Sequence, residues 1–215
     1  MLDILKTYYP LYISGLKITL IISFFSVIFG TTLGIGVAIL KLSKSKAISK
    51  IVGLYIEFIR GTPILVQVFL VVYGLPNLGI KTTDIIGCVI ALTLNSSAYI
   101  AEIIRSGIQS VDKGQMEAAR SLGMSSIMSM KSIILPQAIK NILPALGNEF
   151  ITLIKESAIV SIVGVHDLMY GADTIRGITF DPFVPLIIVA FIYFLITCSL
   201  SLLIKKLEGR LAYND

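Results

Sequence analysis

The segment Glu117-Ala118-Ala119-Arg120-Ser121-Leu122-Gly123, continued by Ile133-Ile134-Leu135-Pro136, is a polar island in a strongly hydrophobic chain. Asp112 precedes the island and predicts the start of a short helix, because its carboxylate can accept from the free backbone N–H groups of a first turn. Gly123 predicts a left-handed turn that ends this helix. A second short helix is expected over residues 126–134, stopping at Pro136. The sequence therefore predicts a knob of two short helices, at about residues 112–136.

Composition places the chain in a membrane. Of its 215 residues, 55% are hydrophobic and 14% are charged, whereas about a quarter of the residues of soluble proteins are charged. The net charge of +5 comes from residues scattered over the loops, so no nucleic acid partner is expected. One histidine and two cysteines inside apolar stretches leave no metal site and no disulfide framework. We expect a single multi-pass domain over residues 1–215 in the cell membrane.

Five apolar stretches predict five transmembrane helices, since each is close to the roughly 20 residues that cross a bilayer. Their expected bounds are Ile18–Leu40, Ile51–Tyr73 with a kink at Pro63, Ile85–Ile104, Ala138–Ile154 and Phe183–Ile204. Between the last two, Ser157–Gly177 is too irregular to cross and predicts a half-inserted or surface helix pair.

The basic residues indicate an orientation. The region 41–50, the region 105–140 and the tail from Lys205 hold 12 of the 18 lysines and arginines, and the opposite side holds five. Basic loops are retained in the cytoplasm. The N-terminus is therefore expected outside the cell and the C-terminus inside.

The island resembles, position for position, the EAA loop of permease subunits of ATP-binding cassette (ABC) importers. That loop reads Glu-Ala-Ala, three residues, Gly, nine residues, an aliphatic residue, one residue and Leu-Pro, which here are Glu117, Ala118, Ala119, Gly123, Ile133, Leu135 and Pro136. Four further stretches look like the polar amino acid uptake branch of this family, namely Glu57–Pro63, Ala98–Arg105, Gly107–Val111 and Leu146–Phe150.

The resemblance implies an all-α type I importer permease fold and a set of partners. These are a second permease subunit, expected to be another copy of the chain, a cytoplasmic dimer of ABC ATPase subunits, an extracellular solute-binding protein, an amino acid substrate and membrane lipid. The first helix of the island would sit in a groove of the ATPase. The residues expected to couple the two subunits are Glu117, Ala118, Ala119, Arg120 and Gly123. The alternative is an ordinary solvated loop.

No catalytic group, metal or cofactor is expected in this chain. The stretch Gly74–Thr82 approaches a phosphate-binding loop, but Ile80 separates its glycine from its lysine. A phosphate-binding loop also needs a strand before it and a helix after it, and this stretch joins two predicted spans. ATP, Mg²⁺ and ATP hydrolysis are therefore expected in the partner subunit, so the chain itself is not an enzyme.

Polar residues inside two spans are candidates for a substrate site, because an ionisable side chain at membrane depth is costly and commonly lines a cavity. Glu149, Thr152 and Glu156 share one face of the fourth span, and Asn95, Ser96 and Tyr99 lie together on the third. They offer acids for an ammonium group and donors for a carboxylate. The alternative makes Asn95 an interhelical hydrogen-bond clamp and Glu149 a partner for another helix.

Other charges are expected to be structural. Glu102 with Arg105, and Glu57 with Arg60, have the i, i+3 spacing of helical ion pairs, and Asp167 is expected to be solvated. The sequence predicts an ABC importer permease for polar amino acids that works by alternating access. Two acids on one helix favour a cationic amino acid such as arginine or lysine. The alternatives are a proton-coupled transporter, in which the same acids carry protons, and a membrane scaffold without transport.

Overall fold

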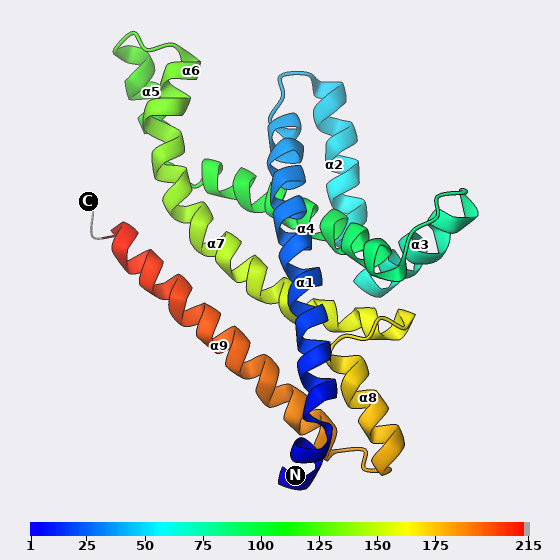
Figure 1. Ribbon diagram of the computed structural model, residues 1–215. Coiled ribbons are helices and arrows are strands. Elements are labelled where there is room, and N and C mark those ends of the chain that lie inside the picture. Colours follow the sequence, from blue (N-terminus) through cyan, green and yellow to red (C-terminus); the bar gives the residue numbers. More distant parts are fainter. Residues whose placement is uncertain (213–215) are drawn as a thin grey trace.

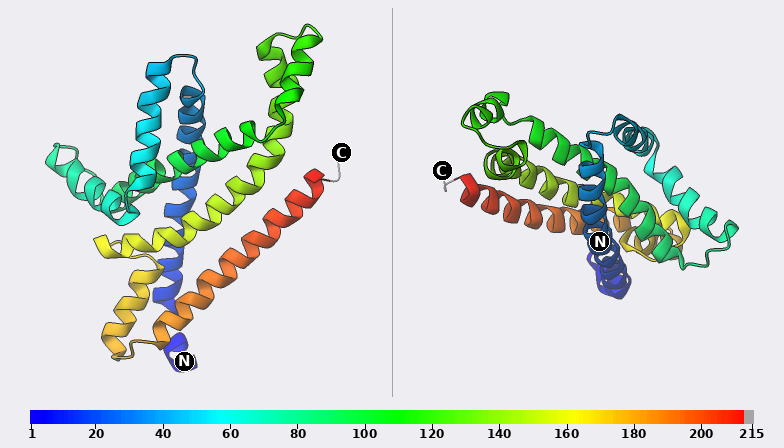
Figure 2. Two further views of the ribbon diagram at one scale, coloured as in Figure 1. Left: turned by 180° about the vertical axis from the view of Figure 1, so that it is seen from behind. Right: turned by 90° about the horizontal axis from the view of Figure 1, so that it is seen from above.

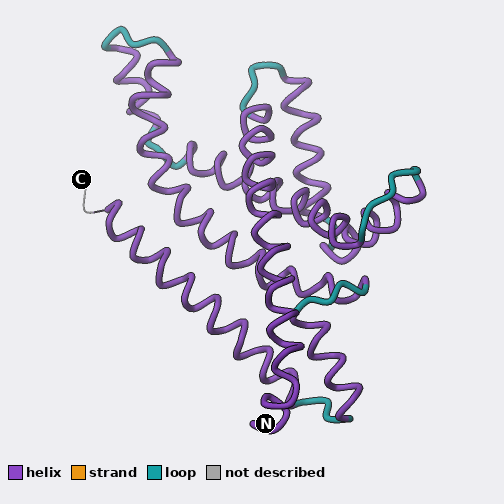
Figure 3. Tube along the Cα trace, in the orientation of Figure 1, coloured by secondary structure: helices purple, strands orange, loops and turns teal. Residues whose placement is uncertain are grey.

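The computed structural model describes residues 1–212, and over this part every regular element is helical (Figures 1 and 3). The α-helices in chain order are α1 (Leu2–Lys41), α2 (Lys46–Gly61), α3 (Ile64–Asn77), α4 (Asp84–Gln109), α5 (Lys113–Ser121), α6 (Ser126–Ser129), α7 (Leu135–Glu156), α8 (Leu168–Thr179) and α9 (Val184–Ala212). A π-helix occupies Met130–Ile134 and a 3-10 helix occupies Ser157–Val163. The predicted all-α class is confirmed.

The first helix is much longer than the span predicted within it. α1 has 40 residues, which at 1.5 Å per residue is about 60 Å, roughly twice the hydrocarbon core of a bilayer. The predicted span Ile18–Leu40 forms its second half, and the helix runs past most of the other elements (Figure 1). Both α4 and α8 therefore pack against α1.

The predicted second span is broken rather than kinked. α2 and α3 meet at 107°, because Pro63 follows a residue, Thr62, that is extended at φ −113° and ψ 142°. The break is stabilised from within: the buried Gln67 amide donates to the carbonyls of Ile59 and Thr62 at 2.7 and 3.0 Å. Figure 2 shows α3 leading away from α1 as a result.

Small residues bring α1 and α4 into close contact. A Cβ placed on Gly34 would lie 2.7 Å from Ile100 Cγ2, and one on Gly30 would lie 3.1 Å from Ser96 Cβ. Both distances are shorter than ordinary carbon contacts of about 3.5–4.0 Å. These two glycines therefore set the separation of the two helices.

The predicted knob is present as α5, α6 and the turn between them, and it projects at one end of the molecule (Figure 1). Gly123 adopts the expected left-handed conformation, φ 85°. The predicted stop at Pro136 is wrong. Helical structure continues from Ser126 through the π-helix into α7. Pro136 lies in the first turn of α7, directly after the π-helix, where the hydrogen-bond pattern of the helix changes.

After α7, Asp167 differs from expectation. It was expected in solvent, but it is fully buried. Its carboxylate accepts from Tyr170 N–H at 2.9 Å and so caps α8. The next residue, Leu168, donates its N–H to Thr19 Oγ1 of α1 at 3.1 Å. The cap thus fastens α8 to α1.

Length and composition alone support fewer spans than predicted. Among the described residues, α1, α4 and the part of α9 up to Lys206 are long and apolar enough to cross a membrane, and the broken pair α2–α3 would make a fourth. α7, expected as a span, is interrupted by polar side chains such as Lys140, Glu149 and Lys155. Five spans therefore remain a prediction.

Candidate functional site

The knob is held together by its own hydrogen bonds. Asp112 Oδ1 accepts from Gly114 N–H at 2.6 Å and caps α5 as predicted. At the other end of α5, Arg120 Nη1 donates to the carbonyl of Met124 at 2.8 Å and ties the two sides of the Gly123 corner together. Arg120, expected to contact a partner, thus makes a hydrogen bond within the knob. The corner is therefore cross-linked by a hydrogen bond.

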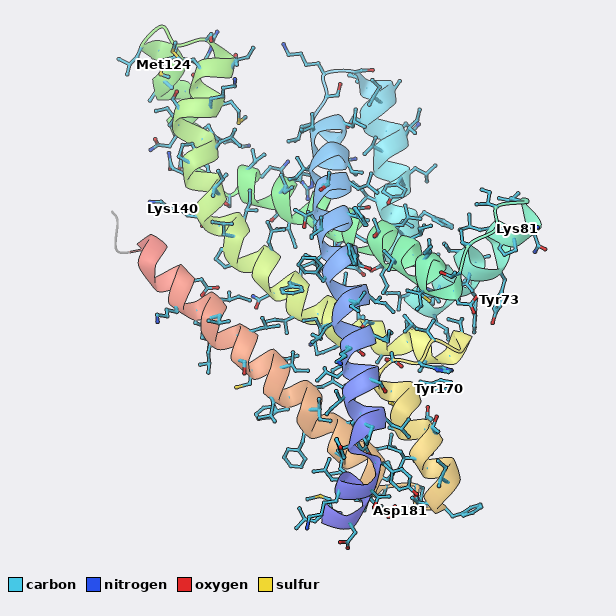
Figure 4. The ribbon with its side chains drawn as sticks, in the orientation of Figure 1. Tyr73, Lys81, Met124, Lys140, Tyr170 and Asp181 are labelled. Atoms are coloured by element: carbon cyan, nitrogen blue, oxygen red, sulfur yellow. The ribbon has the colours of Figure 1, made fainter. Side chains whose placement is uncertain are left out.

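The tip of the knob is apolar and exposed. Leu122 is 85% exposed and Ile127 71%, and Met124, on the same corner, is labelled in Figure 4. Of the predicted coupling residues, Glu117, Ala118, Arg120 and Gly123 are exposed, whereas Ala119 is buried against the rest of the knob. The sequence interpretation missed Leu122 and Ile127 because exposure of an apolar residue in a loop carries no sequence pattern.

A second group of polar residues lies where α4 and α7 meet. Ser96 Oγ donates to Glu149 Oε1 over 3.4 Å. Ser96 is buried and Glu149 is partly buried. The structure therefore brings together one predicted residue from each span. This carboxylate keeps free acceptor capacity on its second oxygen, which suits it to bind an ammonium group.

Asn95 lies on a different face of α4 and is already engaged. It is buried, and its Nδ2 donates to Gln67 Oε1 at 3.0 Å. Through Gln67 it joins the network at the α2–α3 break. Asn95 thus makes an interhelical hydrogen bond, which is the alternative to a role as a ligand. Gln67 was missed, although a glutamine inside the apolar stretch after Pro63 was a usable signal.

Tyr99 faces a cluster of charged side chains. The Arg60 guanidinium lies 5.4 Å from its ring centroid and 3.9 Å from Glu102 Oε1. Glu102 also pairs with Arg105 at 2.5 Å, as predicted. Arg60 was expected to pair with Glu57, but it turns to α4 instead. This cluster ties the end of α2 to α4.

The remaining predicted residues lie further along α7. Thr152 is partly buried, and Glu156, the last residue of α7, is exposed. Glu149 and Glu156 are seven residues apart and share a face. The six predicted residues therefore lie in three different places. Ser96, Glu149, Thr152 and Glu156 lie at or beyond the contact between α4 and α7. Asn95 belongs to the network around Gln67, and Tyr99 stacks on Arg60.

Comparison with known proteins assigns the family. The family described as binding-protein-dependent transport system inner membrane component matches residues 30–213. This chain belongs to that family. The inner membrane component is the membrane-embedded part of such a transport system, which agrees with the apolar helices of this chain and places it in a membrane.

Relatives in this inner membrane component family cover nearly the whole chain. The arginine transport system permease protein ArtQ of Bacillus subtilis is 44% identical over 96% of this chain and 94% of its own length. A Rickettsia bellii protein named for a glutamine transport system permease, GlnP, is 43% identical over 93% of this chain and 92% of its own length.

Solved structures of transporters share the fold. A chain of a crystal structure titled as an amino acid ABC transporter with histidines is 52% identical, has a TM-score of 0.91 and matches over 96% of both chains. A chain of the MetNI methionine ABC transporter in an inward-facing conformation has a TM-score of 0.78 at 19% identity, over 94% of this chain and 96% of its own. The predicted type I ABC permease fold is confirmed.

Proposed function

We propose that this chain is the permease subunit of an ABC importer for polar L-amino acids. The observation that carries the proposal is a continuous helical path, Ser126 to Glu156, that has the knob at one end and the Ser96–Glu149 contact near the other. One element thus joins a surface fit for a protein partner to a carboxylate fit for a charged substrate. Relatives named for arginine and glutamine transport support this substrate class.

The proposed membrane arrangement has one domain, five spans, an external N-terminus and an internal C-terminus. α7 would be the fourth span in spite of its polar residues, because these would line a pathway rather than face lipid. The knob and the loop after Lys41 lie at the same end of the molecule, and the N-terminus lies at the opposite end (Figure 1). The 12 basic residues counted above for the cytoplasmic side support this orientation.

The knob is proposed to couple the chain to the ATPase. An apolar tip with Glu117 and Ala118 beside it would fill a groove of the partner, and the Arg120–Met124 bond keeps the corner rigid. Closure of the ATPase pair on ATP and Mg²⁺ would push the knob and move α7. The chain would then alternate between inward-open and outward-open states, while hydrolysis occurs in the partner.

Glu149 is proposed as the main substrate ligand, with Ser96, Thr152 and Glu156 beside it. The cationic side chain of the substrate would contact the Glu149 carboxylate, and the second acid on the same helix face, Glu156, would add to this attraction. Asn95, bonded to Gln67, and Tyr99, stacked on Arg60, would hold the helices around this group in position. Arginine or lysine is therefore the proposed substrate within the polar amino acids.

The proposed assembly contains two copies of this chain, two ATPase subunits and an extracellular binding protein. Membership of a binding-protein-dependent family supports these partners and disfavours the proton-coupled alternative. A transporter driven by protons would need neither an ATPase nor the knob. No nucleic acid partner is proposed.

The test is to reconstitute the complex in vesicles and measure ATP hydrolysis in the presence of single amino acids. We expect arginine or lysine, delivered by the binding protein, to stimulate hydrolysis more than glutamine, and glutamine more than leucine. A sodium or proton gradient should have no effect on uptake when ATP is absent. Uptake driven by a proton gradient without ATP would refute the proposal.

A further inference from the structure

An apolar groove of about 500 Å³ runs along the contact between α1 and α4. Its α1 wall consists of Ile21, Phe25 and Phe29, and its α4 wall includes Ile86 and Ile90. These side chains are partly or largely exposed although they surround a hollow. In a membrane-spanning helix pair, such a hollow has to be filled by lipid or by another protein chain.

Neither α2 nor α3 lines this groove, whose walls come from α1 and α4 alone. Closer to the knob, Ile56 of α2 packs against Val37 of α1 and Ala101 of α4. Beyond the break the chain turns by 107°, and α3 packs on a neighbouring face of α4 through Val72 against Gly87.

Depth and length favour a single acyl chain. Lys17 comes directly before the charge-free stretch Ile18–Leu40 and marks the expected edge of the hydrocarbon core. The groove begins at Ile21, about one helical turn inside this edge. From Ile21 to Phe29 it extends eight residues, or about 12 Å at 1.5 Å per residue. One leaflet of a hydrocarbon core about 30 Å thick measures about 15 Å. The groove therefore has the length of one leaflet.

Two opposite charges stand at the open end of this groove. Lys17 lies one turn from Ile21 on the same face of α1, and it is exposed. Asp84, the exposed first residue of α4, lies at the same end, because it lines a small cavity together with Ile18, the neighbour of Lys17. The pair complements a headgroup that carries both a phosphate and an ammonium group.

We propose that the groove binds one phosphatidylethanolamine molecule, with an acyl chain between α1 and α4, the phosphate at Lys17 and the ammonium at Asp84. A primary ammonium donates hydrogen bonds to a carboxylate, whereas the quaternary ammonium of phosphatidylcholine has no N–H to donate. Phosphatidylglycerol has no cation for Asp84. This inference depends on the membrane location of the chain and not on its substrate.

Tryptophan fluorescence can test the site, because the chain has no tryptophan of its own. Phe29→Trp reports from the groove. Phe24→Trp is the matched control, since Phe24 is on the same helix, is 55% exposed and does not line the groove. The complete complex is reconstituted in vesicles of phosphatidylcholine with brominated acyl chains, which quench tryptophan. The spectrum of the complex with the unsubstituted chain is subtracted, and unlabelled phosphatidylethanolamine is added stepwise.

We expect brominated lipid to quench the tryptophan at both positions. The fluorescence of the Phe29→Trp variant should recover at an about fivefold lower mole fraction of phosphatidylethanolamine than that of the Phe24→Trp variant. A factor of this size corresponds to about one charge contact at a membrane surface. Asp84→Asn should remove the difference. Lys17→Gln should change it little, because both lipids carry the phosphate, and Asp3→Asn should leave it unchanged. Phe25→Trp provides a second reporter if the Phe29 variant does not assemble. Equal recovery at the two positions would overturn the proposal, and so would a groove tryptophan that brominated lipid does not quench, because a protein chain would then fill the groove.

Discussion

Asn95 on α4 donates a buried 3.0 Å hydrogen bond to Gln67 Oε1 on α3, and Gln67 Nε2 donates to two carbonyls at the end of α2. Three helices are thus fixed by one side chain. Because backbone groups freed at a helix break are costly when they are buried without a partner, this glutamine stabilises a break that proline alone only permits.

Gln67→Leu should destabilise the permease by about 1–3 kcal/mol for each carbonyl that loses its donor. The free energy of unfolding in a detergent titration measures the loss. Gln137→Leu is the control, because Gln137 is exposed and its amide donates to the carbonyl of Ile133, four residues earlier in the chain. In the double variant with Asn95→Leu, the second substitution should cost less than it does alone. If the two losses in the free energy of unfolding simply add in the double variant, the two side chains do not act together.

Gly123→Ala should impair coupling more than folding. Gly123 has φ 85° and open space around its Cβ position, so alanine there costs only backbone strain of about 1–2 kcal/mol. Gly79→Ala is a matched control, since Gly79 has φ 82° and equal space but lies in the α3–α4 loop. We expect the Gly123 variant to lose substrate-stimulated ATP hydrolysis and ATPase association in a pull-down, and the Gly79 variant to retain both. Equal losses in the two variants would exclude a special role of the knob.

Glu149→Gln should impair transport of arginine more than that of glutamine. The neutral amide still accepts from Ser96, but it no longer attracts a cation. Uptake of the two substrates by reconstituted vesicles, measured side by side, gives the ratio of arginine uptake to glutamine uptake. We expect this ratio to fall about tenfold or more, which corresponds to roughly 1.4 kcal/mol. Glu57→Gln, at an exposed site on α2, should not change it. If both substrates lose uptake equally, Glu149 has a structural role.

Gly34→Ala should force α1 and α4 apart, since the new Cβ would lie 2.7 Å from Ile100 Cγ2 and 3.0 Å from the Ser97 carbonyl. Overpacking of this kind costs about 1–3 kcal/mol. Gly36→Ala, two residues away, meets nothing within 4 Å and should gain up to about 1 kcal/mol from helix propensity. Thermal unfolding of the two variants should therefore shift in opposite directions. A stable Gly34 variant would contradict the assigned helix contact.

Asp167→Asn should change the pH dependence of stability. Burial raises the pKa of Asp167 from 3.8 to about 6, against hydrogen bonds from Tyr170 and Met169 N–H that lower it. The folded state then holds a proton that the unfolded state has released. This carboxyl therefore weakens the fold progressively as the pH rises from about 4 to about 6. Asparagine keeps the cap without the charge. The gain in melting temperature over the unsubstituted chain should be larger at pH 7 than at pH 4.5, and a gain independent of pH would contradict the assignment.

The sequence was sufficient for the knob, because its cap at Asp112 and its corner at Gly123 are local features with strong residue preferences. It was insufficient for the α2–α3 break. Proline at position 63 predicts a disturbance, but the angle depends on which carbonyls find donors, and Gln67 supplies them from a later turn. The same reason explains Asp167. Its charge predicts exposure, whereas its place at a helix start packed on Thr19 is a tertiary feature.

The substrate residues show the limit of spacing arguments. Helix periodicity correctly puts Glu149, Thr152 and Glu156 on one face, because this follows from geometry alone. It also places Asn95 and Tyr99 near Ser96, yet these three face Gln67, Arg60 and Glu149 respectively. Which neighbour each side chain meets is decided by the crossing of α4 with three other helices, and one chain read in isolation does not contain that information.

The helical path from Ser126 to Glu156 has a mechanical consequence. Gly107 of α4 packs closely against Ile142 of α7, about 24 Å from Ser126 and about 11 Å from Glu149 at 1.5 Å per residue. If α7 pivots at this crossing, a displacement of the tip would reach Glu149 reduced about twofold and in the opposite direction, with a correspondingly larger force. In the proposed transport cycle, α7 would then act as a lever that exchanges travel at the knob for force at the proposed substrate site.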